Sequence, residues 1–215
     1  MWRNGLMILA GYLVGSLNFA FFLGKLHGID IREEGSGNAG GSNALIVYGK
    51  KAGFIVIILD MLKAFIMVTL AKELFPDPYT CCFTADAVIL GHMFPFYMHF
   101  RGGKGLACLG GSIIALSPLL ALILLIVEIV LLIIMDYIIV LPLTLTVMFP
   151  LLYAVRIQNP YVALILLIPA IPIWIRHIPN FKRIKVGQEP HCLKFLQHAD
   201  EEIERTTGGP NPYKK

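Results

Sequence analysis

Apolar residues run through this sequence in long blocks that short polar segments separate, and this pattern predicts helices that cross a membrane. About 20 consecutive apolar residues cover the roughly 30 Å hydrocarbon core of a bilayer. We expect an all-α integral membrane protein with seven transmembrane helices, one of them short, and three cytoplasmic motif loops. The predicted spans are, in chain order, Leu6–Leu23, Ala52–Leu70, Tyr79–Phe100, a short fourth helix that begins at Leu106, Pro118–Met135, Tyr137–Ala154 and Pro160–Ile175.

The longest apolar block, Leu106–Met135, is too long for one straight span. Ser117 followed by Pro118 divides it, because the residue before a proline is biased away from helical backbone. The helix before this break has about eleven residues, which cover only about 16 Å at 1.5 Å per residue. It cannot cross the membrane alone, so we expect its amino end to lie recessed within the protein.

Composition supports a membrane protein and excludes a soluble globule. Hydrophobic residues make up 57% of the 215 residues and charged residues 15%, with a mean hydropathy of +0.73. The net charge of +4 indicates no nucleic-acid partner, since a basic excess in a membrane protein more often reports orientation. Asp60 and Lys63, inside the second span, are one helical turn apart and can neutralise each other. The four cysteines form no CxxC pair, and we interpret them as small apolar residues.

Basic residues gather in the segments that follow spans one, three and seven. These segments hold ten lysines and arginines near the membrane, against three on the other face. Because such an excess marks cytoplasmic loops, we expect the amino terminus outside and the carboxyl terminus in the cytoplasm. The domain division we expect is one seven-span membrane domain over residues 1–190 and a polar cytoplasmic tail over residues 191–215.

Two of these loops carry glycine-rich motifs suited to anions. The first, GSGNAGGSN at 35–43, can fold its backbone N–H groups into a concave nest, with serine and asparagine side chains as further donors. The second, GHMFPFYMHFRGGKG at 91–105, places Lys104 between glycines at the start of a helix, where backbone donors and the helix dipole also favour a phosphate. Taken alone, the first motif also fits a flexible linker, and Lys104 a charged anchor at the membrane surface.

The third loop reads HIPNFKRIKVGQE at 177–189 and follows the last span. His177 and Asn180 are three residues apart, so a helical turn would bring an imidazole and an amide to one reacting centre. In isolation His177 also fits an interfacial residue without a chemical role. The three loops are informative together, because each supplies anion-binding groups to the same side of the bilayer.

In order and spacing, these motifs resemble the signatures of the bacterial membrane glycerol-3-phosphate acyltransferase family that uses acyl phosphate as donor. The resemblance covers about residues 5–190 and includes the seven-span plan. It implies transfer of a fatty acyl group from acyl phosphate to the 1-hydroxyl of glycerol 3-phosphate, which gives lysophosphatidic acid in phospholipid biosynthesis. It further implies no metal or cofactor, a place in the bacterial inner membrane with the active site on the cytoplasmic face, and a functional link to the soluble enzyme that makes acyl phosphate.

The resemblance also implies which motif residues act. Catalytic roles fall to Ser36, His177 and Asn180, and substrate binding falls to Gly35, Gly37, Asn38, Gly40, Ser42, Asn43, Gly103, Lys104 and Glu189. Acyl phosphate is already activated, so no covalent enzyme intermediate is required. We expect the first motif to hold the leaving phosphate and Lys104 to bind the acceptor phosphate. The general base stays open between a side chain and a phosphate of the substrate itself.

Two positions depart from the family pattern. Ile46 stands where the first motif normally ends in an arginine, and Pro142 replaces a small hydroxyl residue near the start of span six. Loss of one charge-assisted phosphate contact is worth about 1.5–3 kcal/mol, or roughly 10- to 100-fold in affinity. Two alternatives therefore stay open. One is a divergent paralogue that uses acyl phosphate with another acceptor, and the other is a membrane transporter, which the Asp60–Lys63 pair and the broken helices also fit.

Overall fold

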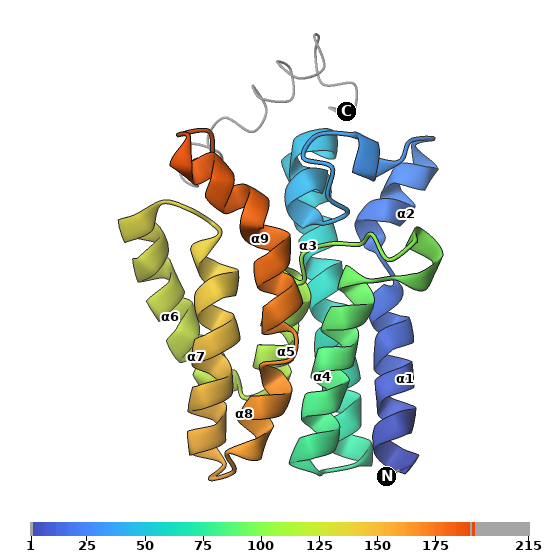
Figure 1. Ribbon diagram of the computed structural model, residues 1–215. Coiled ribbons are helices and arrows are strands. Elements are labelled where there is room, and N and C mark those ends of the chain that lie inside the picture. Colours follow the sequence, from blue (N-terminus) through green and yellow to red (C-terminus); the bar gives the residue numbers. More distant parts are fainter. Residues whose placement is uncertain (1, 190, 192–215) are drawn as a thin grey trace.

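The structure is a computed structural model that describes residues 2–189 and 191, and its regular elements there are helices, without a β-strand (Figure 1). The α-helices are α1 (Trp2–Ser16), α2 (Phe19–Leu26), α3 (Gly41–Leu74), α4 (Pro78–Met93), α5 (Leu106–Leu116), α6 (Pro118–Met135), α7 (Val140–Arg156), α8 (Tyr161–Leu166) and α9 (Ala170–Lys185), and two 3-10 helices are η1 (Ile31–Glu33) and η2 (Phe96–Met98). The predicted all-α class is confirmed.

Helices of membrane-spanning length account for most of the described chain. Five segments are long and apolar enough to cross a bilayer, namely Trp2–Leu26, Gly41–Leu74, Pro78–Met98, Pro118–Met135 and Tyr161–Lys185. Helices α5 and α7 are apolar but shorter. On α6 only Leu120, Leu124 and Glu128 are buried, and the rest of its surface is made largely of exposed leucine and isoleucine. A surface of this kind is stable against lipid and not against water, so the chain is an integral membrane protein.

The helices pack closely where glycine replaces a side chain at their contacts. Helix α1 packs along α4, and α3 packs along α5. A Cβ atom at Gly15 of α1 would collide with the backbone of Val88 in α4, and one at Gly111 of α5 would collide with the carbonyl of Met61 in α3. Small residues let helix backbones approach in a membrane, where packing replaces the hydrophobic effect as the source of stability. These contacts fix the helices that begin or end at the three motifs.

Several sequence predictions agree closely with the structure. The short fourth helix is α5, and α6 begins at Pro118 and ends at Met135 as predicted. Ser117 ends α5 and caps α6, because its hydroxyl accepts a hydrogen bond from Leu120 N at 3.4 Å. Lys63 Nζ lies 2.6 Å from Asp60 Oδ1, so the predicted neutralisation inside the second span is confirmed.

The first two spans differ from the predicted ones. A break at Leu17 and Asn18 divides the first into α1 and α2, and Asn18 caps α2 by accepting a hydrogen bond from Phe21 N at 2.8 Å. Helix α3 begins at Gly41 and not at Ala52, and it bends at Gly49, where φ is 85°. An asparagine cap and a glycine bend are local backbone features, which apolar block lengths do not reveal.

The third and last spans also differ from their predictions. Helix α4 ends at Met93 and not at Phe100, because Pro95 and the left-handed backbone of His99 and Phe100 divert the chain. The last predicted span divides into α8 and α9, and α9 continues ten residues past Ile175 to Lys185. Much of the third motif is therefore helix and not loop. The predicted tail over residues 191–215 lies outside the described residues, apart from His191.

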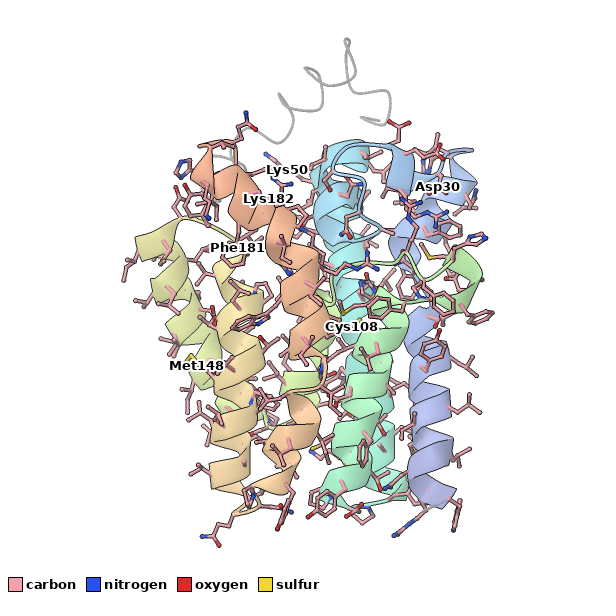
Figure 2. All side chains as sticks on the ribbon, viewed as in Figure 1. Asp30, Lys50, Cys108, Met148, Phe181 and Lys182 are labelled. Carbon is pink, nitrogen blue, oxygen red and sulfur yellow. The ribbon has the colours of Figure 1, made fainter. Side chains whose placement is uncertain are left out.

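The motif segments gather at one end of the bundle (Figure 1). Helix α2, the start of α3 and the end of α9 lie at this end, and the amino terminus of α1 lies at the other. Figure 2 places Asp30, Lys50 and Lys182 at the same end, whereas Met148 lies deeper among the helices. The polar ends of α2, α3 and α9 thus share one side of the molecule, with the α4–α5 connection just below them.

Candidate active site

The second motif forms a tight loop that delivers Lys104 to the start of α5. Gly102 N and Gly103 N donate to Met93 O and His92 O, at 3.0 and 3.1 Å. A side chain at Gly103 would collide with the His92 ring, so only glycine fits there. Gly105 has a φ of +90°, a conformation that favours glycine, and it precedes the first helical residue of α5. Lys104 is therefore held by its neighbours at a helix amino terminus, as the sequence predicted.

Lys104 is the residue that joins the second motif to the third. Its Nζ donates to Asn180 Oδ1 at 2.7 Å. Asn180 Nδ2 in turn donates to Glu189 Oε1 at 2.5 Å, and Arg183 Nε donates to Glu189 Oε2 at 2.6 Å. Asn180 and Glu189 are both buried. The three predicted site residues Lys104, Asn180 and Glu189 thus form one hydrogen-bonded chain, in which a neutral amide links the ammonium to the carboxylate and fixes the direction of the lysine.

His177 lies one turn before Asn180 on α9 and is 5% exposed. Its Nδ1 is 2.7 Å from Ile173 O. Because a carbonyl oxygen only accepts, Nδ1 must carry the hydrogen, and Nε2 of the neutral ring keeps its lone pair. The predicted helical turn is confirmed, and the imidazole is held in a tautomer that can accept a proton at Nε2.

Arg176 is a contact between the motifs that sequence reasoning missed. Its Nη2 donates to Met93 O at 3.2 Å and to Phe100 O at 3.0 Å, and its guanidinium lies 5.2 Å from the centroid of the Phe94 ring. The sequence indicates this residue only as a basic group near the membrane. In the fold it joins α9 to the start and the middle of the α4–α5 connection, so the second and third motifs meet through two residues.

The first motif reaches the second through its backbone. A Cβ on Gly40 would lie 3.9 Å from Gly103 Cα, and a Cβ on Gly103 would lie 2.9 Å from Ala39 O. Upstream, Arg32 Nη1 donates to Met98 O at 2.8 Å, and a hydrogen bond from Arg32 lowers the pKa of Asp30 to about 2. All three motifs therefore converge, and Gly40, the cap of α3, lies beside the loop that carries Lys104.

Three backbone N–H groups of the nest predicted over residues 35–43 are used in the protein's own contacts. Ser36 N donates to Asn43 Oδ1 at 2.7 Å, and Gly37 N and Gly40 N donate to Glu34 O and Asn38 O, each at 3.0 Å. Asn43 is fully buried and donates to Ile31 O and Glu34 O, so its side chain shapes the loop. The remaining donors best placed for an anion are the N–H groups in the first turn of α3, which begins at Gly41 within the same motif.

The other predicted residues of the first motif lie at its surface. Gly35 and Gly37 both have positive φ, at 55° and 73°, and so allow the turn that returns to α3. Ser36 and Ser42 are exposed and Asn38 is half-buried. Within the described part of the chain, no hydrogen bond joins the Ser36 side chain to Lys104, His177 or Asn180. The catalytic role of Ser36 therefore stays a prediction.

The two positions that depart from the family pattern are well defined. Ile46 is half-buried in α3, and its Cγ2 would lie 3.3 Å from a Cβ on Gly35, directly behind the first motif. Pro142 is buried in α7, where its carbonyl accepts a hydrogen bond from Thr146 Oγ1 at 2.7 Å. Ile46 thus adjoins the loop that leads into α3, which gives its substitution a direct route to affect the site.

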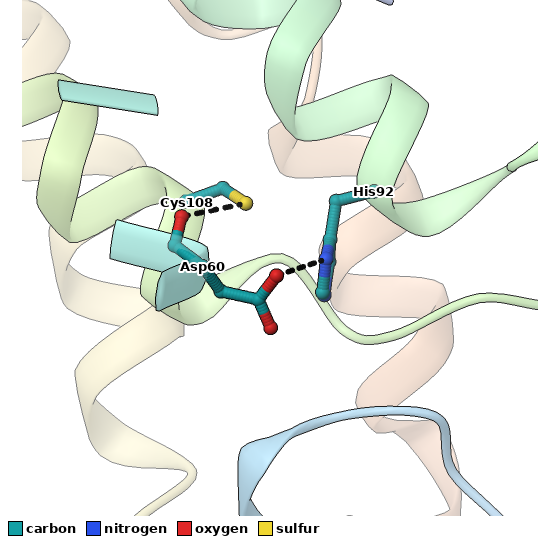
Figure 3. Close-up of side chains that lie close together, drawn as sticks. All are labelled: Asp60, His92 and Cys108. Carbon is teal, nitrogen blue, oxygen red and sulfur yellow. Dashed lines mark hydrogen bonds and ion pairs between the residues drawn. The ribbon is translucent and has the colours of Figure 1, made fainter. Parts of the chain in front are cut away.

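One buried cluster beside the site was invisible in the sequence. Asp60 of α3, His92 of α4 and Cys108 of α5 place potential metal-ligand atoms within 4.8 Å of one another (Figure 3). Spacing along the sequence does not reveal this cluster, because its residues come from three helices. Lys63 Nζ lies 2.6 Å from Asp60 Oδ1 and 3.1 Å from His92 Nδ1, so an ammonium already lies among the ligands. The cysteines Cys81, Cys82 and Cys108 are buried and free.

A family model described as glycerol-3-phosphate acyltransferase matches residues 5–187. The chain belongs to this family. A glycerol-3-phosphate acyltransferase of Legionella pneumophila (strain Philadelphia 1) is 35% identical over 198 residues, which are 92% of this chain and 71% of that protein. One of Geobacillus kaustophilus is 39% identical over 194 residues, which are 87% of this chain and 95% of that protein.

The family also includes solved structures with the same fold. The crystal structure of PlsY (YgiH), an integral membrane glycerol 3-phosphate acyltransferase, in its glycerol 3-phosphate form is 34% identical, with a TM-score of 0.81, and the match covers 90% of this chain and 98% of that one. The lysophosphatidic acid form has a TM-score of 0.79 at 33% identity. The predicted family resemblance is confirmed. Membership of an acyltransferase family also removes the basis for the transporter alternative.

The environment of Lys104 predicts how acceptor binding depends on pH. Burial, and then the nearby Arg183, lower the pKa of Lys104 to about 8. Its charged form therefore predominates at pH 7 and is lost as the pH rises through 8. If Lys104 binds the acceptor phosphate, we expect KM for glycerol 3-phosphate to rise by about tenfold between pH 7 and pH 9, because the phosphate is already largely ionised at pH 7 and only the lysine loses its charge. Initial rates measured against acceptor concentration at both pH values check this.

The control for this profile is Lys104→Arg, which stays charged across the whole range. Its KM should change little between pH 7 and pH 9, whatever its absolute value. The same tenfold rise in this variant would assign the titration to another group.

Proposed function

We propose that the chain transfers a fatty acyl group from acyl phosphate to the 1-hydroxyl of glycerol 3-phosphate in phospholipid biosynthesis, giving lysophosphatidic acid and inorganic phosphate. The observation that carries this proposal is the meeting of Lys104, the amino end of α5 and the amino end of α3 at one place, through the contact of Gly40 with Gly103. Two helix amino termini and an ammonium supply a strong site for phosphate groups. The reaction brings two phosphates together, one on each substrate.

The chemical step needs positioning and charge stabilisation. The 1-hydroxyl oxygen attacks the acyl carbon, the bond from that carbon to the phosphate oxygen breaks, and phosphate leaves with its electron pair. In our proposal the first turn of α3 holds the leaving phosphate, and Lys104 binds the acceptor phosphate. The hydroxyl proton passes to His177 Nε2, which carries the lone pair of the neutral ring because Nδ1 donates to Ile173 O, or to a phosphate oxygen of the substrate. Asn180 fixes Lys104 during the step.

The acyl chain has an apolar route next to this site. A groove of about 260 Å³ lies between α3 and α5, and it is lined by Ile58, Met61, Leu62, Phe65, Gly111 and Ile114. Gly111 is seven residues after Lys104, so at 1.5 Å per residue the groove begins about 10 Å from the lysine. We propose that the distal part of the acyl chain lies along this groove, with its activated end at the amino terminus of α5.

The proposed orientation places the site on the cytoplasmic face of the bacterial inner membrane. Helices α2, α9 and the start of α3 gather at one end, and the basic residues of their segments favour the cytoplasm. A soluble enzyme that makes acyl phosphate could then supply the donor from the same side. This orientation leaves the amino terminus of α1 outside.

The donor is the part of the proposal that an assay tests most simply. Purified protein in lipid receives radiolabelled glycerol 3-phosphate with either palmitoyl phosphate or palmitoyl-CoA. We expect lysophosphatidic acid from palmitoyl phosphate and a rate at least about tenfold lower from palmitoyl-CoA, since a site for a small phosphate does not match a nucleotide carrier. Equal turnover of both donors would reject the proposed donor.

The proposed reaction needs no metal, and this predicts indifference to chelators. The phosphates are bound by backbone donors and Lys104, and the one potential ligand cluster in the described chain already surrounds the Lys63 ammonium. We expect the rate to change by less than about twofold after dialysis against EDTA, as neither substrate contact depends on an ion. A loss of activity that a divalent ion restores would contradict the metal-free mechanism.

A further inference from the structure

The buried cluster around Asp60 contains charges that the proposed chemistry does not use. Asp60 is 1% exposed, His92 3% and Lys63 6%, and all three lie within the helices below the motif loops. Figure 3 shows Asp60, His92 and Cys108 facing one another from separate helices. Charged groups inside a membrane protein are costly, so a group of this kind is typically functional and paired.

Lys63 contacts three groups in this cluster. Its Nζ donates to Leu17 O at 2.5 Å, forms an ion pair with Asp60 Oδ1 at 2.6 Å, and lies 3.1 Å from His92 Nδ1. His92 Nδ1 also lies 3.3 Å from Asp60 Oδ1, the contact marked by a dashed line in Figure 3. The ammonium, the carboxylate and the imidazole thus form one buried group that joins α3 to α4.

One side of this cluster is connected to the first motif. Leu17, which accepts the bond from Lys63, belongs to the break between α1 and α2. The next residue, Asn18, donates from Nδ2 to Ala39 O at 2.8 Å, and this carbonyl lies just before the cap of α3. Leu17 N keeps a local bond to Val14 O at 3.1 Å, and the bond from Lys63 to Leu17 O adds a link from α3, which helps determine where Asn18 holds the first motif.

The other side of the cluster is connected to the second motif. The His92 ring lies directly against Gly103, and His92 O accepts the bond from Gly103 N. Tyr97 of the same connection donates from its hydroxyl to Ser16 O at 2.7 Å, which returns to the helix break. A displacement of the His92 ring would therefore move Gly103 and the adjacent Lys104.

We propose that Lys63, with Asp60 and His92, is a positioning centre that sets the first motif and Lys104 at the right separation for the two phosphates. It acts through Leu17 on one side and through His92 on the other. This inference deepens the proposed function and rests on it. No atom of the cluster is required to touch a substrate.

The test compares two lysines on one helix. Lys72 also lies on α3 and donates to a backbone carbonyl, Ala115 O at 2.8 Å, but it is nine residues farther from the motifs. We expect Lys63→Met to raise KM for glycerol 3-phosphate by at least about tenfold and to lower kcat by a smaller factor. Lys72→Met should keep both within about twofold. Equal effects of the two substitutions would overturn the proposal.

A double variant separates positioning from charge balance. Lys63→Met alone leaves a buried carboxylate, which lowers thermal stability. The double variant Asp60→Asn with Lys63→Met removes both charges, and we expect it to recover the melting temperature of the wild type in detergent while its KM stays raised. Recovery of KM together with stability would show that the cluster only balances charge, which contradicts the proposal.

Hydrogen exchange tests the same inference without catalysis. We expect amides in segments 35–44 and 93–106 to exchange at least about tenfold faster in both the Lys63→Met and the double variants, and at the wild-type rate in Lys72→Met. Unchanged exchange would overturn the positioning centre. If the wild type fails to acylate glycerol 3-phosphate, the proposed function fails, and the exchange rates still decide the positioning role. A stoichiometric metal retained by the cluster in the purified protein would also contradict it.

Discussion

Replacing Lys104 by alanine is expected to lower kcat/KM for glycerol 3-phosphate by about 100- to 1,000-fold, because the substitution removes a charge that is fixed out of bulk water. The lysine is held between glycines at the start of α5, and its Nζ is directed by Asn180 at 2.7 Å. The truncation also removes the hydrogen bond that Asn180 Oδ1 accepts from Lys104. Steady-state rates against acceptor concentration, in lipid and at pH 7, provide the measurement.

Arg101 provides the matched control for this substitution. It lies three residues earlier on the same connection and changes the charge by the same amount, but its side chain is exposed. We expect Arg101→Ala to change kcat/KM by less than about threefold, since an exposed charge is well screened by water and salt. Comparable losses in the two variants would show that only the overall positive charge of the loop matters.

The second large expected effect is tighter binding of the acceptor when Ile46 is replaced. If the chain acylates glycerol 3-phosphate with one acceptor cation fewer than its family pattern, Ile46→Arg should lower the acceptor KM by about 10- to 100-fold through one charge-assisted contact. The residue is half-buried behind Gly35, next to the loop that leads into α3. The KM for acyl phosphate should hardly change, because the donors in the first turn of α3 are untouched.

The same substitution tests the alternative of a paralogue with another acceptor. In that case Ile46 belongs to a more apolar pocket, and a guanidinium there would lower activity on the true acceptor by burying an unpaired charge. Titration of acceptor and donor for the wild type and for Ile46→Arg separates the two outcomes. An unchanged or higher acceptor KM in the variant would reject the missing-cation account of Ile46.

The sequence predicted the fold well where a boundary depends on local chemistry. Ser117 and Pro118 mark the end of α5 and the start of α6 because the first can cap and the second cannot continue a helix. The sequence was less informative where a helix continues through polar residues. The glycine-rich start of α3 and the basic end of α9 lie within helices that apolar block lengths do not show, since helix formation there depends on packing at the bundle end.

The sequence named several residues of the candidate site, but it did not reveal the contacts that distant helices bring to the site. Lys104, Asn180 and Glu189 were identified, and the fold joins them in one hydrogen-bonded chain. Asn43 was expected to contact a substrate, but its amide holds the first motif in shape. The bonds from Arg176 to the second motif and from Lys63 to Leu17 join segments at least 46 residues apart. Such contacts depend on the packing of distant helices, which spacing along one sequence does not encode.

Simultaneous measurement of both products tests the central claim most directly. Purified protein in lipid receives palmitoyl phosphate and glycerol 3-phosphate, and lysophosphatidic acid and inorganic phosphate are quantified over time, with the acylated position determined in the lipid. The account predicts equal amounts of the two products, acylation at the 1-hydroxyl, and the loss of both products together in Lys104→Ala. Phosphate release without lysophosphatidic acid, or no reaction in a folded wild-type protein, would contradict it.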